Sequence, residues 1–330
     1  MAVTKKARHF GIREVARRAG VSTATVSRVF NASPAVLPET RERVLNVAAA
    51  VGYRPSSLGR NLVRGRSDLV GVIVPNIAVP LYGEMLHGIE GVLDTHGMTA
   101  VVMSSLDDPA TERRVARALQ RHAIDGGIVI NSRVGAGLPV QRQAPWVHVA
   151  PEIPDLPYRV ELDNVAGGRL AARHLLAGGG TDFAFIGSAG RESAERERGF
   201  AAELGEAGRA YARATGDYSE ASGGQEARAL FAAGRPDALF VAGDLMAAGV
   251  LRALHERGLH VGRDVAVVGF DDAQLAALLY PRLSSVYQPA FEMGQAAAHL
   301  ARQLIEGRAP APVTFTPGLV VRESSRSLAQ

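Results

Sequence analysis

A short polar surface near the N-terminus has residues that could read the edges of DNA base pairs. If residues 22–31 form a helix, its exposed side consists of Thr23, Ala24, Ser27 and Arg28. Arginine can pair bidentately with guanine, and alanine and the threonine methyl group can contact thymine methyls in the major groove. The same pattern fits an ordinary helical hairpin whose polar face is only hydrated. Periodicity alone does not separate these two interpretations.

The neighbouring residues predict three helices that would position this surface. Apolar residues at i, i+3, i+4 and i+7 predict a helix over residues 12–19, and Gly20 ends it. Ser22 is a good N-cap for the second helix. A third helix is predicted over residues 38–51, with an inward face of Val44, Leu45, Ala48 and Val51. We therefore expect a helix-turn-helix unit.

The charge of the chain is divided between its two ends. Residues 1–66 contain 13 Lys and Arg against 3 Asp and Glu, a net charge of +10, whereas the other 264 residues contain 24 against 30, a net charge of −6. A basic segment on an acidic chain indicates a module that binds a polyanion. Candidates for contacts to DNA phosphates are Lys5, Lys6, Arg8, Arg17, Arg18, Arg41 and Arg43.

From residue 68 onward, short β-rich segments alternate with helical stretches. Examples are LVGVIVP from Leu69, GGIVI from Gly126 and VAVVGFD from Val265. This alternation predicts parallel sheets in doubly wound units, and seven or more strands over some 260 residues indicate two α/β subdomains.

Polar residues follow many of these strands, where parallel sheets place their ligand sites. They are Asn76, Ser104, Ser105, Asn131, Asp163, Asn164, Ser188, Asp244 and Asp271. Each by itself is more often a helix cap or turn residue. Together they suit a hydroxyl-rich small molecule, because carboxylates can accept hydrogen bonds from vicinal hydroxyls. A sugar or glycoside is the leading prediction, and a nucleoside or purine is the alternative.

The motifs of common enzymes do not fit this sequence. In HERGLH, His255 and His260 are one residue too far apart for a zinc-protease motif, and IGSAG around Ser188 is not a nucleophile elbow. The chain has no cysteine, which excludes disulfides and thiolate metal sites. We expect no enzyme, metal or cofactor. The first ten residues lack an apolar run, and we expect a cytoplasmic protein without a membrane span.

Three motifs of the N-terminal unit resemble the LacI family of bacterial transcription regulators. They are VSTATVSRVFN at 21–31, TRERVL at 40–45 and GYRPS at 52–56. The resemblance implies that Thr23, Ala24 and Arg28 read bases, with Ser27 beside them. Gly11 and Leu37 stand where that family usually has capping side chains, and we expect a somewhat less stable headpiece.

The segment of residues 56–66 has two interpretations. Its composition favours a flexible basic linker, because so short a helix is costly to nucleate. The resemblance instead implies a hinge helix that orders on DNA, with Leu62 as a minor-groove wedge beside Ser57 and Arg60. Gly59 replaces the usual alanine and should raise the cost of ordering by up to about 1 kcal/mol.

The resemblance also extends over the rest of the chain. It implies an effector-binding and dimerisation core at 67–330, after a headpiece at 1–55, with a periplasmic-binding-protein-like fold. One subdomain would be 67–162 plus 289–317, and the other 163–288 plus 318–330. The expected effector-binding residues are Asn76, Tyr82, Asn131, Asp163, Arg196, Tyr218, Asp244 and Asp271.

Two departures from the family pattern leave the ligand class open. Val79-Pro80-Leu81-Tyr82 stands where the family has N-P-F-F, and WVHVAP at 146–151 lacks the acidic-Arg pair often found after that strand.

These observations predict a dimeric transcriptional repressor that binds pseudo-palindromic double-stranded DNA under the control of a small polar effector. No apolar heptad follows the last predicted strand, so we expect dimers rather than tetramers. The alternative in another class is a sugar-binding receptor without DNA function. That alternative leaves the basic N-terminal segment unexplained.

Overall fold

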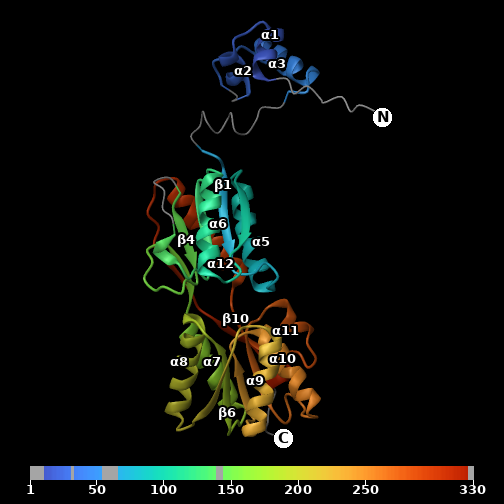
Figure 1. Cartoon of the computed structure of the whole chain (residues 1–330), viewed down its shortest axis with the longest axis vertical. Coiled ribbons are helices and arrows are strands. Elements are labelled where there is room, and N and C mark those ends of the chain that lie inside the picture. Colours follow the sequence, from blue (N-terminus) through green and yellow to red (C-terminus); the bar gives the residue numbers. More distant parts are fainter. Residues whose placement is uncertain (1–10, 31–32, 54–65, 139–143, 326–330) are drawn as a thin grey trace, which may run out of the picture. The chain divides into compact units, whose positions relative to one another are not determined.

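The computed structural model describes residues 11–30, 33–53, 66–138 and 144–325. The chain forms two compact units, Met1–Ser67 and Asp68–Gln330 (Figure 1). Within the described residues, no helix is long and apolar enough to cross a membrane.

The first unit contains three helices around a small apolar core. They are α1 (Ile12–Ala19), α2 (Thr23–Phe30) and α3 (Pro38–Ala50). Gly20 ends α1 in the left-handed conformation with φ 66°, and the Ser22 hydroxyl accepts a hydrogen bond from the Thr25 N–H at 3.1 Å. The predicted helix-turn-helix and its Ser22 cap are therefore present.

One inward residue of the third helix was predicted wrongly. Leu45 is 44% exposed, whereas Val44 and Ala48 are buried and Val47 packs against them. Residues 44, 47, 48 and 51 share one face of the helix, and position 45 is turned about 100° away from 44. As expected, neither Gly11 nor Leu37 provides a side-chain hydrogen bond at its helix start.

The second unit contains two six-stranded sheets. The first sheet has the order β11-β5-β4-β3-β1-β2, and all its described pairings are parallel. Its strands are β1 (Leu69–Val74), β2 (Thr99–Ser104), β3 (Gly126–Ile130), β4 (Trp146–Val149), β5 (Arg159–Leu162) and β11 (Val313–Phe315). Its helices are α5 (Pro80–Thr95), α6 (Pro109–Arg121), α12 (Ala290–Ile305) and the 3₁₀ turn η1 (Gly135–Gly137). We call this part the first subdomain.

The second sheet has the order β12-β10-β9-β8-β6-β7, and only β12 is antiparallel among its described pairings. Its strands are β6 (Phe183–Ser188), β7 (Tyr211–Gly216), β8 (Ala238–Val241), β9 (Ala266–Asp271), β10 (Ser284–Tyr287) and β12 (Gly318–Val320). Its helices are α7 (Asn164–Ala177), α8 (Arg191–Glu206), α9 (Glu220–Ala233), α10 (Asp244–Glu256), α11 (Gln274–Leu278) and the 3₁₀ turn η2 (Glu323–Ser325). We call this part the second subdomain.

The chain passes between the two sheets three times, after β5, β10 and β11 (Figure 1). Apolar residues fill the central strands because these are covered on both faces. The predicted class, a helix-turn-helix unit followed by two α/β subdomains, is confirmed.

Helices α7 and α8 pack closely through reciprocal glycines. A Cβ atom on Gly168 would lie 1.9 Å from the Arg196 carbonyl oxygen, and one on Gly199 would lie 2.0 Å from the Val165 carbonyl oxygen. Only glycine permits this backbone approach. The crossing fixes the position of α8, which carries the central residues of the site described below.

Candidate functional site

The polar surface of α2 is accessible in the first unit. Thr23, Ala24 and Arg28 are exposed, and Ser27 is half-buried. Val26 and Val29, on the opposite side of the helix, are buried in the core. The helix can therefore present these side chains to a groove without disturbing its own packing.

Some of the basic residues near this surface have structural roles. Arg41 donates hydrogen bonds to the carbonyl oxygens of Val29 and Ser33 at 3.2 and 2.6 Å, and so ties α3 to the end of α2. Arg17 and Arg18 hydrogen-bond to Glu14 and lower the pKa of its carboxyl to about 2. Arg41 is thus committed to the fold, whereas Arg43 is exposed on α3. The predicted hinge residues Ser57, Arg60 and Leu62 lie outside the described residues.

Arg196 is the centre of a polar cluster in the second unit. It lies on α8 with a 3% exposed side chain. Its Nε donates to the Asn164 Oδ1 at 2.9 Å, and its Nη1 donates to the Ala242 carbonyl oxygen at 2.6 Å. The guanidinium carbon lies 3.6 Å from the centroid of the Phe270 ring, a favourable cation–π geometry. These contacts hold the guanidinium in one orientation.

Two carboxylates face this guanidinium. Glu192 Oε1 lies 3.5 Å from Arg196 Nη2, and Asp271 Oδ1 lies 4.0 Å from Arg196 Nη1. Burial raises the pKa of both carboxyls, that of Asp271 to about 7, although Arg196 lowers each. Arg196 therefore offsets only part of the effect of burial on the pKa values of these two carboxyls.

The first subdomain contributes Asn131 and Tyr82 to the same cluster. The Asn131 amide donates to the Tyr82 hydroxyl at 3.2 Å and to Glu192 Oε2 at 3.1 Å. Asn131 follows β3 with φ 49°, which asparagine tolerates better than most residues. This amide therefore joins α8 of the second subdomain to the first.

Tyr218 completes the cluster from the turn before α9. Burial raises the pKa of its phenol, as it does for Tyr82, so both remain neutral at physiological pH. Its ring lies against Gly243, where an added Cβ would approach it to 3.1 Å. Of the predicted effector ligands, the structure thus brings together Tyr82, Asn131, Arg196, Tyr218 and Asp271.

The other three predicted ligands have local partners. Asn76 Oδ1 accepts from the Ala78 N–H at 3.0 Å in a turn, and Asp163 Oδ1 accepts from the Ala166 N–H at 2.9 Å as the N-cap of α7. Asp244 is buried and accepts hydrogen bonds from the Ser285 hydroxyl at 2.6 Å and the Ala273 N–H at 3.0 Å. Their roles as effector ligands stay predictions.

Sequence reasoning did not identify Glu192. It lies in the first turn of α8, four residues beyond the end of β6, and its contact with Asn131 depends on the approach of the two subdomains. One signal was present in the sequence, since Glu192 precedes Arg196 by four residues and such residues share a helix face.

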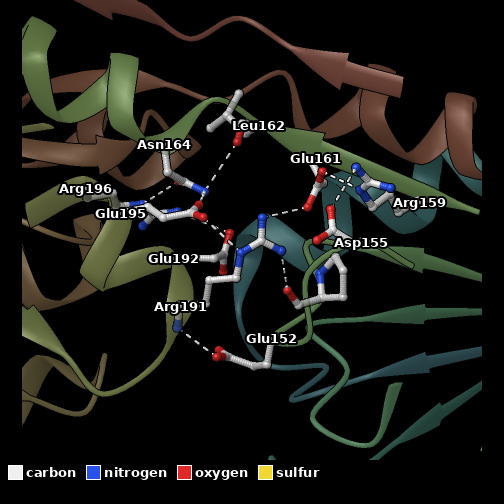
Figure 2. Close-up of polar contacts among 11 residues, drawn as sticks. Glu152, Asp155, Arg159, Glu161, Leu162, Asn164, Arg191, Glu192, Glu195 and Arg196 are labelled. Atoms are coloured by element: carbon white, nitrogen blue, oxygen red, sulfur yellow. Dashed lines mark hydrogen bonds and ion pairs between the residues drawn. The ribbon is translucent and has the colours of Figure 1, made fainter. Parts of the chain in front are cut away.

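An ionic network beside the cluster fixes the start of α8 against the first subdomain. Figure 2 shows the Arg191 guanidinium between Glu161 and Glu195. Its Nη2 donates to Glu161 Oε1 at 2.7 Å, and its Nε donates to Glu195 Oε1 at 2.9 Å. Arg191 also donates to the Pro151 carbonyl oxygen at 2.9 Å, and its backbone N–H donates to Glu152 Oε2 at 2.7 Å. Pro151, Glu152 and Glu161 belong to the first subdomain, so the network positions Glu192 by holding its neighbour.

The cluster does not have the composition of a metal centre. Among the residues that the structure describes, no group of three His, Cys, Asp or Glu could hold a metal ion. What the arrangement offers a ligand is a fixed guanidinium, carboxylate acceptors, an amide and two phenols.

Known proteins resemble the chain along nearly its whole length. The profile of bacterial regulatory proteins of the lacI family matches residues 11–56, and that of the periplasmic binding protein-like domain matches residues 172–325. The HTH-type transcriptional regulator DegA of Bacillus subtilis (strain 168) is 33% identical over 96% of this chain and 98% of DegA. The ribose operon repressor of Halalkalibacterium halodurans is 32% identical over 96% of this chain and 97% of that protein.

A solved structure shows the same similarity in three dimensions. The lac repressor dimer bound to operator and the anti-inducer ONPF has a TM-score of 0.87 and 27% sequence identity to this chain. The match covers 97% of this chain and 100% of the lac repressor chain.

Proposed function

The chain belongs to the LacI family of bacterial regulatory proteins, and we propose that the cluster around Arg196 binds its effector. The protein is a DNA-binding transcriptional repressor rather than an enzyme, and it acts on operator DNA as a dimer. The predictions of family, regulatory function and partners are confirmed. The proposal concerns the identity of the effector and the residues that bind it.

One observation carries this proposal. The Asn131–Glu192 hydrogen bond at 3.1 Å joins the two subdomains beside the fixed guanidinium of Arg196. A ligand that bonds to these side chains would change the free energy of one arrangement of the subdomains relative to another. Such differential binding is what effector control requires.

The chemistry of the cluster supports a sugar or glycoside as the effector. Carboxylates of Glu192 and Asp271 can accept from hydroxyls, Arg196 and Asn131 can donate to them, and phenol rings can stack on a sugar ring. The similarity to a ribose operon repressor agrees with this class. A nucleoside is the second candidate, because its ribose has the same vicinal hydroxyls.

On the DNA side, we assign base reading to the exposed face of α2, formed by Thr23, Ala24, Ser27 and Arg28. Ser57, Arg60 and Leu62 of the 56–66 segment would act at the minor groove as a hinge. The proposed domain organisation is then a DNA-binding headpiece at 1–55, the hinge at 56–66, and an effector-binding and dimerisation core at 67–330. A repressor of chromosomal genes acts where the DNA is, so we assign the protein to the cytoplasm.

The test is an operator-binding assay with candidate effectors. An operator would be selected from random DNA with the full chain, and its affinity measured by fluorescence anisotropy with and without sugars and nucleosides. We expect one sugar to change the dissociation constant by at least about fivefold. A response to nucleosides alone would contradict the sugar assignment and favour the second candidate.

A variant connects that response to the cluster. Arg196→Lys keeps the charge but loses the planar fork, and we expect it to weaken effector binding at least about tenfold. Arg252→Lys, in an exposed pair with Glu220, is the matched control. An unchanged effector response in a folded Arg196→Lys protein would exclude Arg196 from the site.

A further inference from the structure

Glu192 contacts both halves of the proposed effector site. Its Oε2 accepts from Asn131 of the first subdomain at 3.1 Å, and its Oε1 lies 3.5 Å from Arg196 Nη2 of the second. The side chain remains 14% exposed, so its carboxylate is not sealed within the protein.

The cation beside Glu192 is committed to other groups. Arg196 Nε and Nη1 donate to Asn164 and to the Ala242 carbonyl oxygen, and the guanidinium lies over Phe270. Asp271 approaches the same guanidinium to 4.0 Å and is 17% exposed. One guanidinium therefore faces two carboxylates whose side chains are partly exposed.

Further acidic groups surround this pair. Glu152 and Glu195 add negative potential at Glu192, and Glu84 does so at Asp271. Arg191, which directly precedes Glu192, is engaged by Glu161 and Glu195. Acidic side chains therefore outnumber the cations around the cluster.

We infer that Glu192 sets the charge selectivity of the effector site, which favours a ligand presenting hydroxyl or ammonium donors and rejects one presenting phosphate or carboxylate. This inference rests on the proposed function, since it concerns the same site. Its physical basis is that like charges within a few ångströms in a poorly solvated site repel strongly, whereas hydroxyls and ammonium groups satisfy the acceptors there. A second anion would meet a guanidinium that already faces two carboxylates, and it would have little bulk water around it.

The experiment compares matched ligands on the full-length protein by isothermal titration calorimetry. The probes are D-ribose, D-glucose and D-galactose, the phosphate ester of each, and the 2-amino derivatives of the two hexoses. For the sugar that binds, we expect the phosphate ester to bind at least about tenfold more weakly and the amino sugar at least as tightly.

Glu192→Gln tests the residue itself. Glutamine keeps the size and an acceptor for Asn131 but removes the charge, so the preference against the phosphate ester should shrink by about tenfold. Glu206→Gln removes the same charge from the other end of α8, where Glu206 is 64% exposed and paired with Arg169, and should leave the preference unchanged. Thermal unfolding of each variant confirms that it is folded.

The possible failures are distinguishable. If phosphate esters bind as tightly as the parent sugars, or if Glu192→Gln leaves their ratio unchanged, the inference is wrong while a sugar effector still stands. If none of the sugars, phosphate esters or amino sugars binds, the proposed sugar effector is wrong, and the inference is wrong with it.

Discussion

Arg28 is the charged residue of α2, and the helix exposes it while burying Val26 and Val29. A guanidinium in this position can reach either a guanine edge or a phosphate, and the two roles have different consequences. Base contacts specify sequence, whereas phosphate contacts only position the protein.

We predict that Arg28→Ala relaxes specificity at one base pair in each half-site. Loss of a bidentate contact to guanine should cost about 1–3 kcal/mol of discrimination at that position alone. Gel shifts against operators substituted at every position measure this. Arg43→Ala, at an exposed position of α3, serves as the control and should weaken all operators equally and reduce the salt dependence. If Arg28→Ala weakened binding to all of these operators equally, Arg28 would be a phosphate contact and not a base-reading residue.

The raised pKa of Asp271 predicts that the stability of the core depends on pH. Burial raises its pKa in the folded protein to about 7, against a usual value of 3.8. The folded state therefore binds this proton more tightly than the unfolded state. The resulting contribution to stability is fully present below about pH 4 and is lost as the pH rises towards 7.

Asp271→Asn should remove that dependence. The quantity to compare is the unfolding free energy of the variant minus that of the wild type. This difference should be about 1–3 kcal/mol larger at pH 8 than at pH 5. Urea unfolding of the core at both pH values gives the comparison, and Asp94→Asn on the exposed side of α5 corrects for the loss of one carboxylate. An equal effect at both pH values would show that Asp271 does not titrate in this range.

At the scale of elements, the crossing of α7 and α8 links packing to the proposed effector site. α7 begins with Asn164, which holds Arg196, and α8 carries both Arg196 and Glu192. The two helices approach through Gly168 and Gly199, so their separation fixes the distance between these side chains.

Gly199→Ala should push the helices apart. Its Cβ would lie 2.0 Å from the Val165 carbonyl oxygen, which cannot move without the backbone of α7. We expect a loss of about 1–3 kcal/mol or more in stability, with weaker effector binding. Gly205→Ala is the matched control on α8, because no described atom lies within 4 Å of its added Cβ. That variant should be neutral or more stable by up to about 1 kcal/mol, and thermal unfolding with calorimetric titration distinguishes the two.

At the scale of the whole molecule, function depends on linkage between units that the chain connects through residues 56–66. A single headpiece has only a few side chains that we propose read bases, so we expect sequence specificity to require two headpieces in a dimer. An effector can then alter DNA binding by changing the arrangement that the paired cores favour.

Linkage predicts a reciprocal measurement. If the effector changes the operator dissociation constant by a given factor, typically about 5–150-fold, saturating operator must change the effector dissociation constant by the same factor. Titrations in both directions at one salt concentration test this, with a core fragment beginning at residue 68 as a control that binds effector alone. Unequal factors would mean that the two ligands are not linked through one common equilibrium.

The sequence by itself determined the features that depend on local pattern. Helical periodicity placed α1, α2 and α3 to within about a residue, and apolar runs located the central strands, because these are covered on both faces. It did not locate β5 or the edge strand β7, since half-exposed strands such as Tyr211–Gly216 have no continuous apolar run. The exposed face of α2 was predicted because the helical repeat of its own apolar residues indicates which side is buried and which side remains exposed.

The tertiary structure alone decided which side chains share the site. Arg41 bonds to the end of α2 although its sequence context suggested a phosphate contact. Asp163 is a helix cap, whereas Glu192, in the first turn of α8, contacts Asn131, which is 61 residues away in the sequence. The reason is physical: a strand end can be read from local sequence, but the approach of two subdomains depends on three chain crossings and on long-range packing. The grouping of charges in the proposed effector site follows from that approach.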